Sequence, residues 1–277
     1  MTSNPQARLQ PRLFSRRSML FTLGTWSTAS GARAEDTAAE LQIQKPGSTM
    51  VPGQRLTTEL VHLLFVGDSL AQGLFLTLQP ALRRRDTVRV TNGTQHATGI
   101  TRSDEHDWPT VTRDLVTRHR PDLVVFWIGA NDFRPLVLRE TRSRFQFGTS
   151  AFAEHYGNRV GQMVSAVMSR NARSIWLGLP NMRDAQFASA VRILNEVQEA
   201  ASTTIGAVFV PTWQATSDGE GRYMPSLESE RGRRPLRVED GVHFTDLGYR
   251  HVAGLIFETV ATRFPELSIA FGRGVET

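Results

Sequence analysis

Four polar residues of this chain have the types and the order that nucleophilic acyl transfer requires. They are Ser69, Asn131, Asp240 and His243, and each comes after an apolar run that predicts a buried strand. In a parallel sheet the carboxyl ends of the strands share one edge, so side chains that are far apart in sequence can converge there. Convergence of these four would bring together a nucleophile, a base and hydrogen-bond donors.

The residue types define the role of each side chain at such an edge. A serine hydroxyl needs a neighbouring base, for which His243 is the candidate, and a carboxylate such as Asp240 would fix the imidazole tautomer. The oxyanion of a tetrahedral intermediate needs donors, and the Ser69 N–H, the Asn131 amide and a glycine N–H would supply them. The Gly-X-Ser-X-Gly elbow of α/β-hydrolases is absent because position 71 is Ala, so a site of that kind is excluded.

Ser69 also has a purely structural interpretation. The apolar periodicity of residues 70–82 predicts a helix, so Ser69 stands where a strand ends and a helix begins. Free N–H groups and the helix dipole stabilise negative charge at that point, but Ser is also a favoured N-cap. This stretch alone does not separate a cap from a nucleophile, and the presence of Asn131 and His243 favours the nucleophile.

Composition excludes several classes of protein. The 277 residues contain no cysteine, which excludes disulfide frameworks, thiolate metal sites and cysteine nucleophiles. The net charge is +5, and residues 1–34 hold five arginines and no acidic residue, so the rest of the chain is neutral. The basic character therefore does not indicate nucleic-acid binding. The spacing of the histidines does not suit a metal site, and no cofactor is expected.

Residues 1–34 resemble an export signal peptide. Arg16-Arg17 precede a modestly apolar stretch, and Ala32-Arg33-Ala34 fits a cleavage site before Glu35. The adjacent arginines favour a twin-arginine signal over an ordinary secretory one, and predict a periplasmic or secreted protein. Residues 35–59 are expected to form an extended linker, and no later run is long enough to span a bilayer.

The remaining chain, residues 60–277, predicts a single α/β domain. Its apolar runs are continuous rather than alternating, and helical stretches of ten to twenty residues separate them, which is typical of a parallel sheet covered on both faces. We expect a three-layer α/β/α sandwich with a five-stranded, mainly parallel, flavodoxin-like sheet. The predicted strands cover residues 61–66, 87–90, 123–128, 174–179 and 207–210, and the predicted helices cover residues 70–82, 107–120, 150–169, 185–202 and 245–264. An exposed basic hairpin containing Arg231, Arg233, Arg234 and Arg237 is expected between the last strand and the last helix, and a polyanion-binding site is the alternative for these arginines.

Three motifs in the same order resemble the SGNH (GDSL) hydrolase superfamily. They are Gly67-Asp68-Ser69-Leu70, Gly129-Ala130-Asn131-Asp132 and Asp240-Gly241-Val242-His243, and the resemblance extends from about residue 61 to the last predicted helix. One such motif is weak, but three in order, each after a predicted strand, are specific. The resemblance implies Ser69 as nucleophile, Asn131 as oxyanion donor, and His243 as base with Asp240 orienting it.

The resemblance leaves the oxyanion glycine open between two residues. Gly99 is favoured over Gly93, because its separations of 30 and 32 residues from Ser69 and Asn131 are the more typical of the family. Arg134 and Arg183 follow two of the predicted strands and could hold an anionic or carbonyl-bearing substrate group. Pairing with surface carboxylates is the alternative role for both arginines.

Further stretches, among them Thr98-Gly99-Ile100 and Asp107-Trp108-Pro109, resemble a bacterial exported SGNH subgroup of unassigned function. Some SGNH proteins of this sort accompany exopolysaccharide synthesis, including that of cellulose, which implies O-acyl sugars as substrates and export or polysaccharide-synthesis machinery as partners. The expected function is an exported serine esterase that removes O-acyl groups, above all acetyl, from a carbohydrate or another periplasmic ester. The alternatives are an O-acyltransferase that uses the same residues and a non-catalytic carbohydrate-binding subunit.

Overall fold

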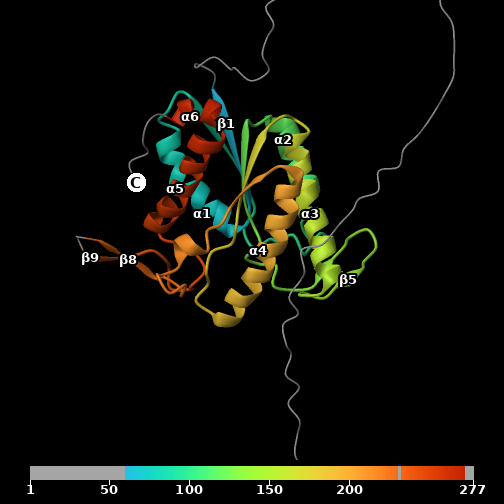
Figure 1. The fold of residues 1–277 in the computed structure, drawn as a ribbon. Helices are drawn as coiled ribbons and strands as arrows, with labels where there is room; N and C mark the ends of the chain where they lie inside the picture. The colour runs from blue at the N-terminus through green and yellow to red at the C-terminus, as the bar shows by residue number, and fades with distance from the viewer. Residues whose placement is uncertain (1–59, 230–231, 272–277) are drawn as a thin grey trace, which may run out of the picture. The chain divides into compact units, whose positions relative to one another are not determined.

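The structure is a computed structural model that describes residues 60–229 and 232–271. The predicted signal peptide, residues 1–34, and the predicted linker, residues 35–59, lie outside the described residues, as does Arg231 of the predicted hairpin. The described part forms three layers, with a sheet between two sets of helices (Figure 1).

The sheet has five parallel strands in the order β2-β1-β3-β6-β7. This confirms the predicted α/β/α sandwich and its flavodoxin-like sheet. Strand order reverses beside β1, and the carboxyl ends of β1 and β3 form the point where such sheets place their ligands. The strands are β1 (Val61–Gly67), β2 (Val88–Thr94), β3 (Leu123–Trp127), β6 (Arg173–Leu177) and β7 (Val208–Val210).

Helices cover both faces of the sheet, as Figure 1 shows. One face carries α1 (Ser69–Leu82), α5 (Asp246–Arg263) and α6 (Pro265–Phe271), and the other carries α2 (Trp108–His119), α3 (Ser150–Met168) and α4 (Ala185–Ile205). Helix α6 was not predicted, because Pro265 breaks the apolar periodicity of α5 and starts a second, shorter helix.

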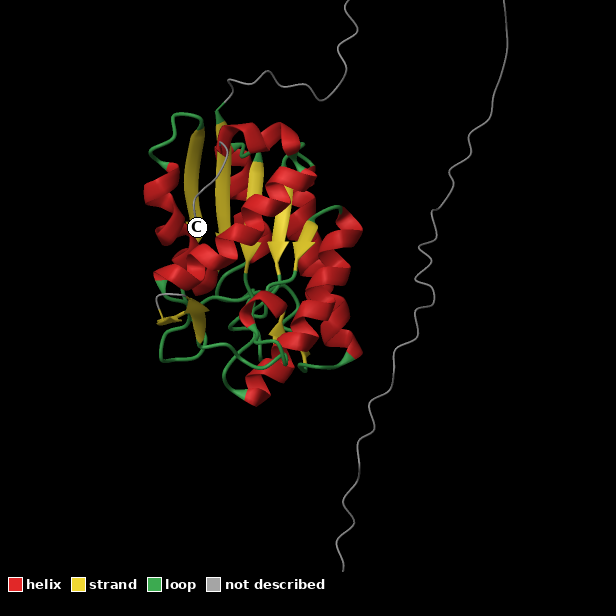
Figure 2. Ribbon diagram, turned by 60° about the vertical axis from the view of Figure 1, so that its left-hand side comes forward, coloured by secondary structure: helices red, strands yellow, loops and turns green. Residues whose placement is uncertain are grey.

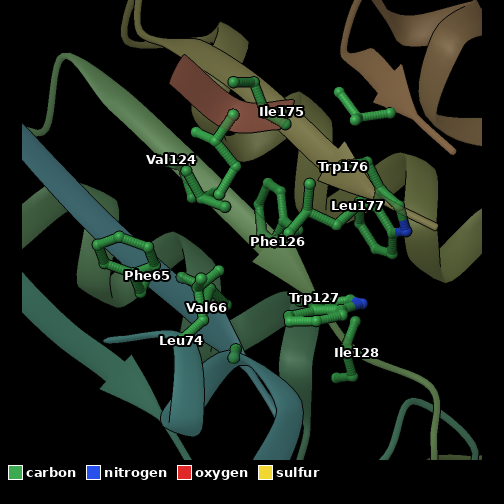
Figure 3. Packing of buried hydrophobic residues seen from close by; sticks show 14 of the residues in the cluster. Phe65, Val66, Leu74, Val124, Phe126, Trp127, Ile128, Ile175, Trp176 and Leu177 are labelled. Carbon is green, nitrogen blue, oxygen red and sulfur yellow. The ribbon is translucent and has the colours of Figure 1, made fainter. Parts of the chain in front are cut away.

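The core lies where the central strands meet the helices. All seven residues of β1 and all five of β3 are buried, which explains why their sequences are apolar apart from His62, whose ring lies 2.7 Å from the Thr91 hydroxyl. Figure 3 shows Phe126 of β3 lying against Trp176 of β6, with ring centroids 5.0 Å apart. Trp127, the last residue of β3, donates its indole N–H to the Gly178 carbonyl at 3.1 Å, which joins the ends of two strands beneath the candidate site.

Strand β1 ends at a glycine that the fold requires. Gly67 has a φ of +147°, and a Cβ on it would lie 2.0 Å from the Trp127 carbonyl oxygen. A side chain at this position would therefore push β1 away from β3. The close approach holds the turn after β1 against the end of β3, and these are the two segments that carry Ser69 and Asn131.

Strand β2 extends to Thr94, four residues beyond the predicted strand. The extra residues are polar or glycine and pair with the end of β1, for example Asn92 with Phe65. They were missed because β2 is an edge strand, where partly exposed polar residues are tolerated and the apolar signal is weak.

Short strands lie beyond the arrowheads of the main sheet (Figure 2). The first pair is β4 (Leu136–Val137) with β5 (Arg144–Phe145), and the second pair is β8 (Ser226–Ser229) with β9 (Gly232–Pro235). A short 3-10 helix covers Gln214–Thr216. Both hairpins therefore border the edge of the sheet at which the candidate residues lie.

Candidate active site

Ser69 is the first residue of helix α1, and the cap of this helix is Asp68. The Asp68 carboxylate accepts the Leu70 N–H at 3.0 Å, so the capping role considered for Ser69 belongs to its neighbour. The Ser69 hydroxyl is left to bond elsewhere, and its oxygen lies 2.7 Å from Nε2 of His243. In a first-turn residue the backbone N–H has no partner within the helix, which makes it a natural donor to a developing negative charge.

His243 and Asp240 lie in the turn before helix α5. Nδ1 of His243 is 2.6 Å from Oδ2 of Asp240, while Oδ1 of Asp240 accepts the backbone N–H groups of Val242 and His243 at 2.8 and 2.9 Å. The carboxylate next to Nδ1 favours the tautomer with its proton on Nδ1. Nε2 is then free to accept the Ser69 proton.

The Asp240 carboxylate beside the His243 ring stays charged although it is partly buried. Partial burial works to raise the pKa of Asp240, but the hydrogen bonds from the His243 ring and the backbone of Val242 outweigh it and lower the pKa to about 2. A carboxylate that is ionised throughout the working pH range can stabilise an imidazolium at every stage of a reaction.

Asn131 and Gly99 meet at the carboxyl edge from neighbouring loops. The Asn131 side chain donates one N–H to the Thr98 carbonyl at 2.8 Å, which fixes the amide beside the loop of residues 95–107, called the glycine loop below. Gly99 and Asn131 line one small hollow in the surface, together with Arg134 and His106. The second N–H of the Asn131 amide has no partner among the described residues and remains available to a ligand.

Of the two candidate glycines, the structure places Gly99 beside Asn131. Gly93 lies inside strand β2, where an added Cβ would meet Leu115 and the Phe65 carbonyl, so its small size serves packing. At Gly99 an added Cβ would lie 2.2 Å from Oδ1 of Asp132. Gly99 therefore permits the close approach of the glycine loop to the segment that carries Asn131.

Two buried carboxylates connect the loops of the site. Asp68 accepts the backbone N–H groups of Gly129 and Ala130 at 2.9 and 3.0 Å, which ties the turn carrying Ser69 to the segment carrying Asn131. Burial raises the pKa of Asp68 to about 6 in spite of these hydrogen bonds. Asp132 accepts the N–H groups of Ile100 and Thr101 and so ties that segment to the glycine loop.

Arg237 is buried, so its place in the predicted exposed hairpin is wrong. Only 5% of the residue is exposed, and its guanidinium donates to the carbonyls of Asn181 at 2.8 Å and Val242 at 2.6 Å. It also lies over the Phe244 ring, 4.0 Å from the centroid. The buried Arg237 side chain therefore supports the turn that contains Asp240 and His243. Its signal in the sequence was the apolar Leu236, a buried residue that lies between Arg237 and the exposed arginines of β9.

The two arginines predicted to bind substrate both lie at the edge of the site. The side chain of Arg134 donates to the Asn131 carbonyl at 2.7 Å, and the backbone N–H of Arg183 donates to the Gly241 carbonyl at 3.2 Å. The side chain of Arg183 packs against Gly241. Each arginine is therefore attached to a segment that carries a candidate catalytic group, and neither forms an ion pair within the described residues.

The described residues offer no metal site. No three His, Cys, Asp or Glu side chains are grouped so that they could hold an ion within residues 60–229 and 232–271. In the same residues, no helix has the length and the apolar character that crossing a membrane requires.

Residues 62–259 match a family model whose description is protein of unknown function, DUF459. The chain belongs to the DUF459 family. No curated protein matches the chain in sequence. The matched residues include every residue of the candidate site. They also include Asp68 and Asp132, whose carboxylates connect the loops of the site.

Solved structures share the fold of this DUF459 protein at low sequence identity. A GDSL-like lipase from Bacteroides thetaiotaomicron is 18% identical with a TM-score of 0.51, over 72% of this chain and 87% of the other. A variant of Axe2, an acetylxylan esterase from Geobacillus stearothermophilus, is 16% identical with a TM-score of 0.52, over 74% and 96%. LAE5, an alpha/beta hydrolase enzyme from the metagenome of Lake Arreo, Spain, is 14% identical with a TM-score of 0.52, over 75% and 98%. The likeness is one of fold, and it agrees with the three-layer fold that the resemblance to the SGNH (GDSL) hydrolases implied.

Replacing the orienting carboxylate tests the role of the Asp240–His243 pair in this DUF459 protein. We expect Asp240→Asn to lower kcat for a simple ester by about 10⁴-fold, because the amide would favour the imidazole tautomer that cannot accept the Ser69 proton. Steady-state kinetics with p-nitrophenyl acetate would measure the loss. Glu239→Gln, which alters the neighbouring exposed carboxylate, is the matched control. Equal rates for the two variants would contradict the role given to Asp240.

Removing the side-chain donor tests the oxyanion site. We expect Asn131→Ala to lower kcat by about 10²-fold with a much smaller change in KM, since the amide would bind charge that develops in the transition state. The lost hydrogen bond to Thr98 should cost only about 1 kcal/mol of stability. A thermal melt beside the kinetics separates the two effects, and unchanged kcat would mean that the oxyanion donors lie elsewhere.

Proposed function

We propose that this DUF459 protein is a serine esterase that removes O-acyl groups, above all acetyl, from a carbohydrate or another ester in the periplasm. One observation supports this most strongly, which is the continuous hydrogen-bonded chain from the Ser69 hydroxyl through His243 to Asp240. A pure binding protein has no need for a base paired to a serine. The likeness in fold to an acetylxylan esterase agrees with an ester substrate on a glycan.

The geometry suggests the following reaction. Ser69 Oγ attacks the ester carbonyl carbon while its proton passes to Nε2 of His243, and the carbonyl oxygen becomes an oxyanion. The N–H groups of Ser69 and Gly99 and the Asn131 amide would donate to that oxygen. Collapse breaks the ester C–O bond, and the leaving alcohol takes the proton from His243. Water then attacks the acyl-enzyme by the same proton path, which releases the carboxylic acid and restores Ser69.

The proposal is tested by ester hydrolysis with the purified chain beside its Ser69→Ala variant. Serine-dependent release of nitrophenol from p-nitrophenyl acetate is expected. The assay would be repeated with an unacetylated oligosaccharide present, because acetate that appears on the oligosaccharide would favour the alternative of acyl transfer. Release at equal rates by both proteins would overturn the proposed nucleophile and leave the alternative of a carbohydrate-binding subunit.

Export is the second part of the proposal and is supported by the sequence of residues 1–34 alone. The paired arginines Arg16-Arg17 favour a twin-arginine export route, and the small residues at positions 32 and 34 favour cleavage before Glu35. Mass spectrometry of the protein recovered from the periplasm of expressing cells should give a chain that begins at Glu35. A link to exopolysaccharide production, with its synthesis machinery as partner, is proposed from the resemblance and from the carbohydrate substrate class.

A further inference from the structure

A basic hairpin, defined here as residues 134–148 with strands β4 and β5, lies against the glycine loop. The Val137 N–H donates to the Thr101 carbonyl at 2.8 Å, and the Ser103 hydroxyl donates to the Val137 carbonyl at 2.9 Å. Figure 1 shows β5 beside α3, on the other side of the molecule from β8 and β9. The basic hairpin therefore continues the surface of the candidate site outward from Gly99 and Asn131.

The charge of the basic hairpin is not neutralised within the described residues. It contains four arginines and one glutamate, and the side chains of Arg139, Arg142 and Arg144 are exposed without an ion pair in those residues. The segment around β8 and β9, residues 218–235, holds as many acidic residues as arginines, four of each. There Arg233 pairs with Glu228 and Arg222 pairs with Asp218, each at 2.8 Å. Unpaired arginines concentrated beside the site create a positive potential that attracts an anionic ligand.

An exposed aromatic ring lies between the basic hairpin and the catalytic residues. Phe133 follows Asn131 by two positions, and 43% of it is exposed. Its ring stacks on Phe187 at 6.0 Å with an interplanar angle of 15°, and it meets Phe147 edge to face at 5.5 Å. A ring held in this way is a rigid flat surface, and covering it would bury apolar area at little cost in side-chain entropy.

We propose that the ester is carried by an anionic polysaccharide, whose chain crosses Phe133 and runs along the basic hairpin. The inference rests on the proposed function and narrows its substrate class. The apolar C–H face of a sugar ring matches an exposed aromatic ring, and sugar carboxylates match guanidinium groups, which bind planar oxyanions through paired hydrogen bonds. A neutral glycan such as cellulose would leave the arginines of the basic hairpin without partners.

The experiment measures binding by isothermal titration calorimetry, with the full chain and a galacturonic acid hexamer as the anionic probe. Cellohexaose is the neutral probe, and a single-stranded DNA hexamer is a polyanion without sugar carboxylates. We expect the anionic sugar to bind more tightly than either, with an affinity that falls as salt is raised. The triple variant R139Q/R142Q/R144Q should bind it roughly tenfold more weakly, because three exposed charge contacts are lost.

The control variant removes the same charge from another part of the domain. Arg83, Arg84 and Arg118 are exposed near the ends of α1 and α2, which is the edge opposite the site, so R83Q/R84Q/R118Q should bind like the unmodified chain. Phe133→Ala, in a different segment, should also weaken binding and guards against a misfolded triple variant.

Several results would overturn the proposal. These are equal binding of cellohexaose or of the DNA hexamer, equal loss in both triple variants, or no binding of the anionic hexamer. Serine-dependent hydrolysis of p-nitrophenyl acetate, measured in the same samples, tests the proposed function separately. Hydrolysis without anionic binding overturns only the substrate class, and binding without hydrolysis overturns only the esterase.

Discussion

Replacing Ser69 by alanine should abolish ester turnover and leave the fold intact. We expect kcat for p-nitrophenyl acetate to fall by about 10⁶-fold, since loss of the nucleophile in a serine–histidine pair removes almost all covalent catalysis. Within the part of the chain that the structure describes, the Ser69 hydroxyl makes one hydrogen bond, to His243, and Asp68 caps the helix. The alanine variant should therefore keep its melting temperature within a few degrees, because the cap and the core are unchanged.

Ser103→Ala is the matched control for this variant. Ser103 is a buried serine whose hydroxyl joins the glycine loop to the basic hairpin through the Val137 carbonyl and the Arg139 N–H. Its loss should lower stability more than Ser69→Ala does and lower turnover far less. If Ser69→Ala retained turnover within tenfold of the unmodified chain, the nucleophile would be a different group.

Replacing His243 by alanine should have an effect of the same size. Without the imidazole no group of the site accepts the Ser69 proton, and we expect kcat to fall by about 10⁶-fold. His251, which lies in helix α5 and bonds the Ala215 carbonyl at 2.8 Å, provides the control variant His251→Ala. The control variant should be less stable, because the hydrogen bond to the Ala215 carbonyl is lost, and should keep most of its activity.

The double variant distinguishes a working pair from two independent residues. If Ser69 and His243 act in one proton transfer, as proposed, Ser69→Ala/His243→Ala should be no slower than either single variant. Kinetics of the three variants with one ester would show this directly. A double variant that is slower than both single variants would indicate that the two residues act separately. Fully independent losses would multiply to about 10¹²-fold.

The sequence predicted the sheet because its signal is strong there. The strands β1 and β3 are buried on both faces, so burial selects apolar residues along them, with His62 of β1 as the polar exception. The order of the motifs then placed Ser69 and Asn131 at adjacent strand ends, and a parallel sheet brings such ends together. The turn containing Asp240 and His243 was assigned to the same site because it forms the third motif of the resemblance.

The connections within the site could not be predicted in the same way. Arg237 is buried because its donors are satisfied by carbonyls of two loops, and such partners are set by tertiary structure and not by local pattern. Asp132 lies next to Asn131, but its bonds to the glycine loop depend on how that loop returns to the sheet. The short strands β4 and β5 are too brief to give a periodic signal, so residues 134–148 carried only a charge signal.

Covalent labelling is the most direct test that Ser69 is the nucleophile. A fluorophosphonate reacts with a serine that is activated by a neighbouring base, and its adduct stays on the oxygen that attacked. After digestion, mass spectrometry should find one adduct, on the peptide that contains Ser69, and none on Ser69→Ala or on denatured protein. An adduct on another residue of the native chain, or an unlabelled Ser69 in a chain that still hydrolyses esters, would contradict the assignment of Ser69 as the nucleophile.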